Sequence, residues 1–302
     1  SIRPRSHFHV HRGRLLVAFC LTAVLSLSVH AVMLQVFDVP YPSAQISSPL
    51  PDIVNNAIAA WVTIWLFAQL RRTWPRRSRA VHAGIVFLLL CGLNETLRGW
   101  FMNGYCTGAQ GWLFFAIMAV PAMLLYAATA AAAALVERFA KPRRMFHCAA
   151  LAVSVLIGLV GFPLVSWGKG AAFAAFGDMV AGGGWCQLPY GMNVLAPAYL
   201  TFVEPALACL MCCALASPFL CKNRAGRIVQ FTLLTLALKK QLFMALFYAL
   251  YAPLPFGAAL LSMGQFSLEA AVLGVATALS WAYASNGIHS AKAASNGSAL
   301  AP

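Results

Sequence analysis

Residues 80–105 read AVHAGIVFLLLCGLNETLRGWFMNGY, a stretch apolar enough to cross a bilayer that nevertheless contains Glu95 and Arg98. These two charged residues are three positions apart, so they share one face of a helix. Placing either charge in hydrocarbon costs at least about 2.5 to 3.5 kcal/mol on insertion scales. We therefore expect Glu95, Arg98 and the neighbouring Asn94 to face other helices or a hydrated cavity inside a membrane protein.

The composition of the whole chain supports a membrane protein. Of its 302 residues, 61 % are hydrophobic and only 9 % are charged, whereas roughly a quarter are charged in an average soluble domain. The net charge of +14 does not indicate nucleic-acid binding, because the basic residues separate apolar runs and do not form a binding motif. Membrane lipids are the expected surroundings, and no nucleic-acid partner is expected.

The apolar runs predict an all-α, polytopic bundle of about eight spanning helices, since each run is close to the ~20 residues that a crossing needs. We expect a basic tail at 1–14, a single bundle at 15–284 and a tail at 285–302 that is disordered because it is rich in Ala, Ser, Gly and Asn. The predicted spans are 15–37, 53–70, 80–102, 111–136, 147–168, 194–216, 227–251 and 257–283.

The first span also permits another interpretation. Basic residues, an apolar run and small residues at 28–31 resemble a cleavable secretory signal. The apolar run continues to residue 37, which is long for a signal core, so a retained anchor is favoured. Eight spans could also form two four-span halves in parallel orientation, although the sequence shows no convincing echo between them.

Positive charges in the connectors predict the orientation of the chain. Seventeen basic residues lie on one side and only Lys169 lies on the other, so both termini are expected in the cytoplasm and the protein in a bacterial inner membrane. The seventeen are Arg3, Arg5, Arg12, Arg14, Arg71, Arg72, Arg76, Arg77, Arg79, Arg138, Lys141, Arg143, Arg144, Lys222, Arg224, Arg227 and Lys292.

Acidic residues inside spans are candidate site residues because they are rare there. Glu95 and Arg98 are expected near the outer leaflet, and Glu204 and Glu269 near the bilayer middle. Pro205 directly follows Glu204 and is expected to kink that helix. We expect Glu95 and Arg98 to line an outer vestibule, and Glu204 and Glu269 to belong to a midplane site.

Lys239 and Lys240 fall inside the seventh predicted span and permit two interpretations. If 227–251 is one continuous crossing, both lysines lie near the midplane and Lys239 joins the midplane glutamates. If 227–241 lies at the cytoplasmic surface, both lysines snorkel to water or headgroups, but the crossing then contains two prolines that suit a turn better. The first interpretation is favoured.

Cysteines divide according to the predicted topology. Cys106 and Cys186 are the two in outer connectors, where an oxidising compartment permits a disulfide between them. Cys209, Cys212 and Cys213 stand at helical spacing, but no fourth ligand or redox partner accompanies them, so packing is the favoured role. The histidines form no convincing metal or haem site, and neither a metal nor another cofactor is expected.

These features favour a small carrier or permease that uses intramembrane Glu, Arg and Lys residues for substrate or proton coupling. Its substrate is a small molecule, an ion or a lipid, which the sequence does not specify. Two alternatives remain: a membrane enzyme acting on a lipid or polyprenyl-linked substrate, and a non-catalytic subunit bound to a partner membrane protein. No nucleophile motif is present and no catalytic residue is identified, so an enzyme is less favoured.

Overall fold

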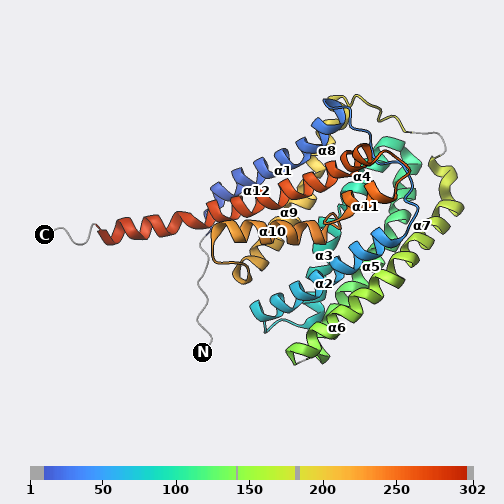
Figure 1. Ribbon diagram of the computed structural model, residues 1–302. Coiled ribbons are helices and arrows are strands. Elements are labelled where there is room, and N and C mark those ends of the chain that lie inside the picture. The colour runs from blue at the N-terminus through green and yellow to red at the C-terminus, as the bar shows by residue number, and fades with distance from the viewer. Residues whose placement is uncertain (1–9, 141, 181–183, 298–302) are drawn as a thin grey trace.

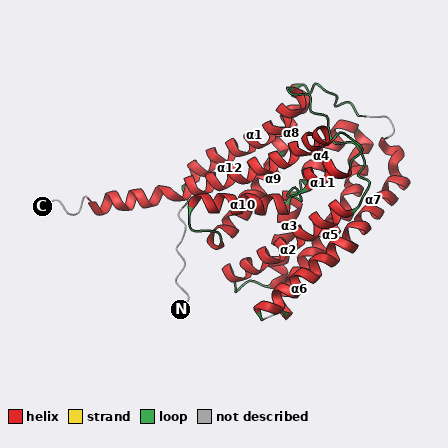
Figure 2. Cartoon of the chain, viewed as in Figure 1, coloured by secondary structure: helices red, strands yellow, loops and turns green. Residues whose placement is uncertain are grey.

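The computed structural model describes residues 10–140, 142–180 and 184–297. Within these ranges every regular element is a helix, as Figure 2 shows. The all-α class predicted from the sequence is therefore confirmed. The expectations for residues 1–9 and 298–302 lie outside the described residues.

Six helical segments of the described chain are long and apolar enough to cross a membrane. This supports a multi-pass membrane protein, because the apolar surface of such helices needs lipid around it. Their bounds differ from the predicted spans mainly by added turns at the ends, and the segment Arg143–Val180 covers about half of the predicted connector 169–193. The six are α1 (Arg12–Gln35), α2 (Leu50–Thr73), α5 (Ala109–Phe139), α6 to η2 (Arg143–Val180), α8 to η3 (Met192–Phe219) and α12 (Phe256–Gly297).

The segment Arg143–Val180 consists of three pieces of helix and a last 3-10 turn. They are α6 (Arg143–Leu156), η1 (Ile157–Gly161), α7 (Phe162–Phe176) and η2 (Gly177–Val180). The segment Met192–Phe219 likewise divides into α8 (Met192–Thr201), α9 (Val203–Ala216) and η3 (Ser217–Phe219). The α8–α9 junction directly precedes Glu204 and Pro205, where the sequence predicts a kink.

Two of the predicted spans are broken helices, so the continuous helices expected at 80–102 and 227–251 are wrong. The first consists of α3 (Arg79–Leu93) and α4 (Thr96–Thr107), which are bent by 40° and count as a seventh crossing if they are one span. The second consists of α10 (Arg224–Leu238) and α11 (Met244–Tyr251). In both, the helix stops where polar or charged side chains interrupt the apolar run, and these side chains bond to groups outside their own helix.

The order of helices repeats along the chain. α3 and α10 both contain 15 residues and both follow a side-chain N-cap, Ser78 bonded to Val81 N–H and Asn223 bonded to Gly226 N–H. Each is followed by a break, a short helix and one long helix, α5 or α12. The packing of the helices repeats as well. The contact of α1 with α12 corresponds to that of α7 with α5, and the contact of α3 with α9 corresponds to that of α10 with α2. The two halves are therefore arranged alike, although their sequences show little similarity.

Close packing in the middle of the bundle brings α3 and α9 together (Figure 1). Gly92 makes this approach possible, since a Cβ there would lie 2.8 Å from the Cβ of Ala208. The core around this contact is apolar and includes Phe67, Phe202 and Phe231, each fully buried. Helix α12 runs beside α1 and continues past the other helices to Gly297, beyond the expected end of the bundle at residue 284.

Candidate functional site

The first helix break, called break 1 (Asn94 and Glu95), ends α3 in a helix-capping conformation. Glu95 adopts a left-handed backbone with φ of 57°, and its N–H donates to the carbonyl of Gly92 at 3.1 Å. The Asn94 side chain donates back to the carbonyl of Leu90 at 2.9 Å, a local bond that competes with helix continuation. A non-glycine residue costs about 1 to 2 kcal/mol in this backbone region, so other interactions must compensate for Glu95.

The second break, called break 2 (Lys239 and Lys240), repeats this conformation at the end of α10. Lys240 is left-handed with φ of 59°, and its N–H donates to Ala237 O at 3.1 Å. The next N–H, that of Gln241, donates to Leu236 O at 2.7 Å, which completes a Schellman motif. Glycine is the usual residue at this position, and here charged residues occupy it in both halves.

The two breaks complete each other's hydrogen bonds. The Nδ2 of Asn94 donates to the carbonyl of Leu238 at 3.2 Å, and the Nζ of Lys239 donates to the carbonyl of Leu93 at 3.0 Å. Leu93 and Leu238 are the last residues of α3 and α10. Their backbone carbonyls therefore accept no hydrogen bond within their own helices. Each break thus supplies the donor that the other helix end lacks, which lets both helices stop inside an apolar bundle.

The carboxylate of Glu95 lies between two cations. Its Oε1 is 2.5 Å from Lys239 Nζ, and its Oε2 forms an ion pair with the guanidinium of Arg98 in the first turn of α4. Side-chain exposure is 19 % for Glu95 and Arg98 and 7 % for Lys239, so water screens these pairs poorly. One carboxylate between two cations leaves this cluster with a surplus positive charge.

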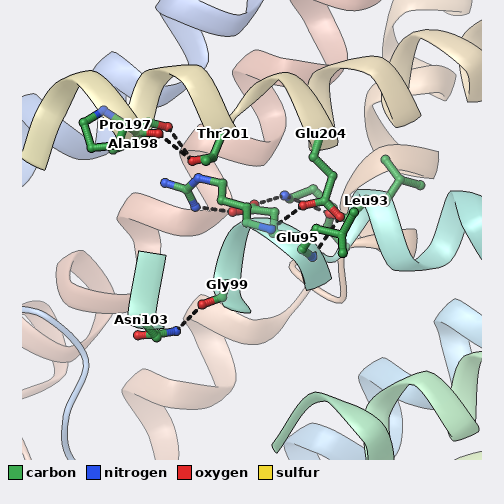
Figure 3. Close-up of polar contacts among 11 residues, drawn as sticks. Leu93, Glu95, Gly99, Asn103, Pro197, Ala198, Thr201 and Glu204 are labelled. Carbon is green, nitrogen blue, oxygen red and sulfur yellow. Dashed lines mark hydrogen bonds and ion pairs between the residues drawn. The ribbon is translucent and has the colours of Figure 1, made fainter. Parts of the chain in front are cut away.

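Glu204 of the neighbouring helix α9 bonds to the start of α4 (Figure 3). Its two carboxylate oxygens accept hydrogen bonds from the backbone N–H groups of Leu97, at 3.0 Å, and Arg98, at 2.5 Å. These N–H groups have no acceptor inside α4, and the positive end of the helix dipole favours an anion there. Glu204 therefore replaces the missing N-cap side chain of α4, because Glu95 at that position makes no capping bond.

A cavity of about 350 Å³ lies beside the ion pair of Glu95 and Arg98. Glu95, Arg98 and Glu269 form part of its lining together with aromatic side chains, among them Tyr190. Its rim includes Cys106 and Cys186, which a disulfide joins. His30, Tyr41 and Phe266 also line the cavity.

Glu269 is the carboxyl group of this cavity that has no direct partner. It is 4 % exposed, and within the described residues it makes no hydrogen bond or ion pair. A second cavity of about 190 Å³ reaches the breaks and is also lined by Glu269, together with Glu95, Lys239 and Phe266. Glu95, Phe266 and Glu269 line both cavities and so form the partition between them.

Most of the charged residues singled out from the sequence come together, though in a different grouping. Lys239 pairs with Glu95, and Glu204 bonds to the α4 backbone, so the expected midplane group of Glu204, Lys239 and Glu269 is replaced by Glu95, Lys239 and Glu269 around the smaller cavity. Lys240 points elsewhere, with its Nζ 4.9 Å from the centre of the Tyr126 ring. The break at residue 239 causes this separation of the two lysines.

Sequence reasoning missed the aromatic part of the cavity. His30 and Tyr41 contact the Phe266 ring, with ring centroids 4.7 and 5.5 Å apart. These residues come from α1, the connector after it and α12, which are far apart in the sequence. The spacing of Phe266 three residues before Glu269 was the one available signal, since these positions share a helix face.

Cysteines and possible metal ligands show no further site within the described chain. Cys209, Cys212 and Cys213 are at most 2 % exposed and belong to the apolar core, and no three His, Cys, Asp or Glu residues are placed to hold a metal ion. No family model, curated protein or solved structure matches this chain.

Proposed function

We propose that this protein is a small carrier of the bacterial inner membrane, with eight crossings and both termini in the cytoplasm. In this topology α3 with α4 and α10 with α11 each form one crossing, added to the six segments that are each long enough to cross alone. The excess of basic residues in one set of connectors supports the orientation. The disulfide of Cys106 and Cys186 then faces the oxidising outer compartment, and the cavity that it borders opens outward.

The observation that carries this proposal is the position of the two helix breaks. Carriers commonly bind their substrates where discontinuous helices expose backbone groups near the bilayer middle. Here the ion pairs of Glu95 with Lys239 and Arg98 lie at such breaks, and a cavity large enough for a small polar molecule reaches them. A purely structural ion pair would not require a cavity of this size beside it.

The cavity favours a substrate that is small and polar. The Nε of Arg98 is buried without an acceptor in the described chain, and Glu269 has no donor, so the site offers one unused donor and one unused carboxyl. A substrate with an anionic and a cationic or protonated group would satisfy both. A proton on Glu269 is the alternative partner, which makes this residue the coupling candidate.

Transport by reconstituted protein tests the proposal. Proteoliposomes are incubated with a mixture of small polar metabolites, with and without an inward acid gradient, and their contents are identified by mass spectrometry. We expect at least one compound to accumulate with the native protein and to fall to the level of empty vesicles with Glu269→Gln. Glu137→Gln serves as the control, because Glu137 pairs with Arg71 and Arg79 away from this cavity.

The absence of any accumulated compound at verified membrane insertion would contradict a carrier. Accumulation that Glu95→Gln and Glu269→Gln both leave unchanged would contradict the proposed site. Chemical conversion of a lipid-linked substrate in detergent, without a vesicle, would instead support the enzyme alternative.

A further inference from the structure

A second pair of adjoining cavities lies along α2 and shares no lining residue with the two cavities at Glu269. One of about 800 Å³ is lined by basic residues at the end of α2 and the start of α6, and one of about 560 Å³ is lined almost entirely by apolar residues of α2, η3 and α10. Trp65, Phe146 and His147 line both cavities. The two cavities therefore adjoin each other and differ in chemistry.

The basic cavity has a surplus of positive charge. Arg71, Arg72 and Arg143 line it, against one carboxylate, Glu137. That carboxylate already lies 3.7 Å from Arg71 and 2.8 Å from the guanidinium of Arg79. Arg72 and Arg143 form no ion pair within the described residues, and the one side-chain partner of Arg72 is the neutral Oε1 of Gln69 at 3.2 Å, so neither guanidinium has a counter-charge and both can bind an anion.

The apolar cavity extends from the basic one along the membrane-spanning part of α2. Ile58, Trp61 and Trp65 lie along one face of that helix, over about 10 Å or two turns. Leu233 and Ala237 of α10 form the opposite wall. This cavity suits a hydrocarbon chain that lies parallel to the helices.

We propose that this pair of cavities binds an anionic glycerophospholipid, with its phosphate beside Arg72 and Arg143 and an acyl chain along Ile58 to Trp65. A basic pocket between membrane helices at the cytoplasmic end is a recognised setting for acidic lipid headgroups. A small anion would leave the apolar cavity without an occupant, and an apolar helix of another protein would leave two arginines without a counter-charge. An amphiphile with a negative head satisfies both cavities.

Native mass spectrometry of the detergent-solubilised protein tests this site, with phosphatidylglycerol as the probe. We expect Arg72→Gln combined with Arg143→Gln to weaken binding about 10- to 30-fold, from the loss of two charges at the headgroup. The matched control combines Arg76→Gln with Arg144→Gln, which removes the same charge from neighbouring positions that do not line the cavity. The control should bind phosphatidylglycerol as the native protein does.

Three results would overturn the proposal. Equal losses in both double variants would show general electrostatic attraction to the basic face. Equal binding of phosphatidylcholine with the same acyl chains would show an apolar contact without headgroup recognition. Displacement of the lipid by millimolar glycerol phosphate, which has no acyl chain, would show a site for a soluble anion.

The apolar half of the site is tested separately. Leu233→Trp fills the groove and should reduce phosphatidylglycerol binding severalfold, whereas Val229→Trp, on the exposed surface of α10 outside the cavity lining, should not. Equal effects of the two tryptophans would contradict an acyl chain in this groove. Thermal unfolding of each variant verifies that it is folded before its lipid binding is compared.

Discussion

Break 1 and break 2 share one backbone conformation but differ in what surrounds them. Glu95 at break 1 lies between Lys239 and Arg98 and faces a cavity of about 350 Å³. Lys240, at the equivalent position of break 2, stacks on Tyr126 beside a cavity of only about 10 Å³. The left-handed residue therefore pairs with cations and faces a cavity at Glu95, whereas at Lys240 it packs against an aromatic ring beside almost no free space.

The difference follows from the sign of the charge at the left-handed position. Carboxylate oxygens at break 1 attract cations from both halves and leave polar groups facing a space that water or a substrate can enter. The ammonium group of Lys240 lies over the ring of Tyr126, a cation–π contact that stabilises the charge and fills the space beside it.

The largest expected effect comes from removing the carboxylate of break 1. Glu95→Gln leaves Lys239 buried without its anion, and loss of one partner of a buried pair costs about 3 to 5 kcal/mol. We expect the melting temperature of the detergent-solubilised protein to fall by roughly 10 °C. Fluorescence-detected thermal unfolding measures this shift.

A double variant separates the lost ion pair from other effects of the substitution. Glu95→Gln combined with Lys239→Met removes both charges, so most of the lost stability should return. If the single variant unfolds within about 2 °C of the native protein, the pair is not the main compensation for the left-handed backbone at break 1.

A smaller effect is expected at the start of α4. Glu204→Ala removes the acceptor for the N–H groups of Leu97 and Arg98, which should cost about 1 to 3 kcal/mol because no other acceptor replaces it. The melting temperature should fall by roughly 5 °C, less than for Glu95→Gln, since no buried cation loses its partner. Glu204→Gln keeps one acceptor oxygen and should recover part of the loss. Equal stability of Glu204→Ala and the native protein would contradict the capping role.

Sequence patterns predicted the apolar helices well, because hydropathy over ~20 residues reports burial in lipid directly. They failed at 80–102 and 227–251, where the run stays apolar enough for a continuous helix. The breaks depend on hydrogen bonds between residues far apart, Asn94 to Leu238 and Lys239 to Leu93, which no local pattern contains. The repeat of the two halves was equally hidden, since it is preserved in helix order and not in residue identity.

Charge rarity identified most residues of the site but not their partners. Glu95, Arg98, Lys239 and Glu269 were all predicted, because an ion inside a membrane span needs a polar environment. Glu204 was expected to share a midplane site with Glu269, whereas its carboxylate accepts hydrogen bonds from the N–H groups at the start of α4. An unbroken helix has no free N–H groups at that depth. A prediction that assumes such a helix therefore contains no hydrogen-bond donors for the Glu204 carboxylate.

The smallest expected effect belongs to Lys240 of break 2. Lys240→Met replaces the ammonium group above Tyr126 by an apolar chain of similar length, and since a cation–π contact contributes about 0.5 to 2 kcal/mol, the net change should stay within about 1 kcal/mol. The melting temperature should then shift by no more than about 4 °C, and vesicle accumulation of any transported compound should persist. Lys239→Met, one residue earlier, leaves Glu95 with only Arg98 and should lose both stability and accumulation. Equal damage from the two methionines would mean that Lys240 takes part in function as Lys239 does, and that the small cavity beside Tyr126 opens at another stage of the transport cycle.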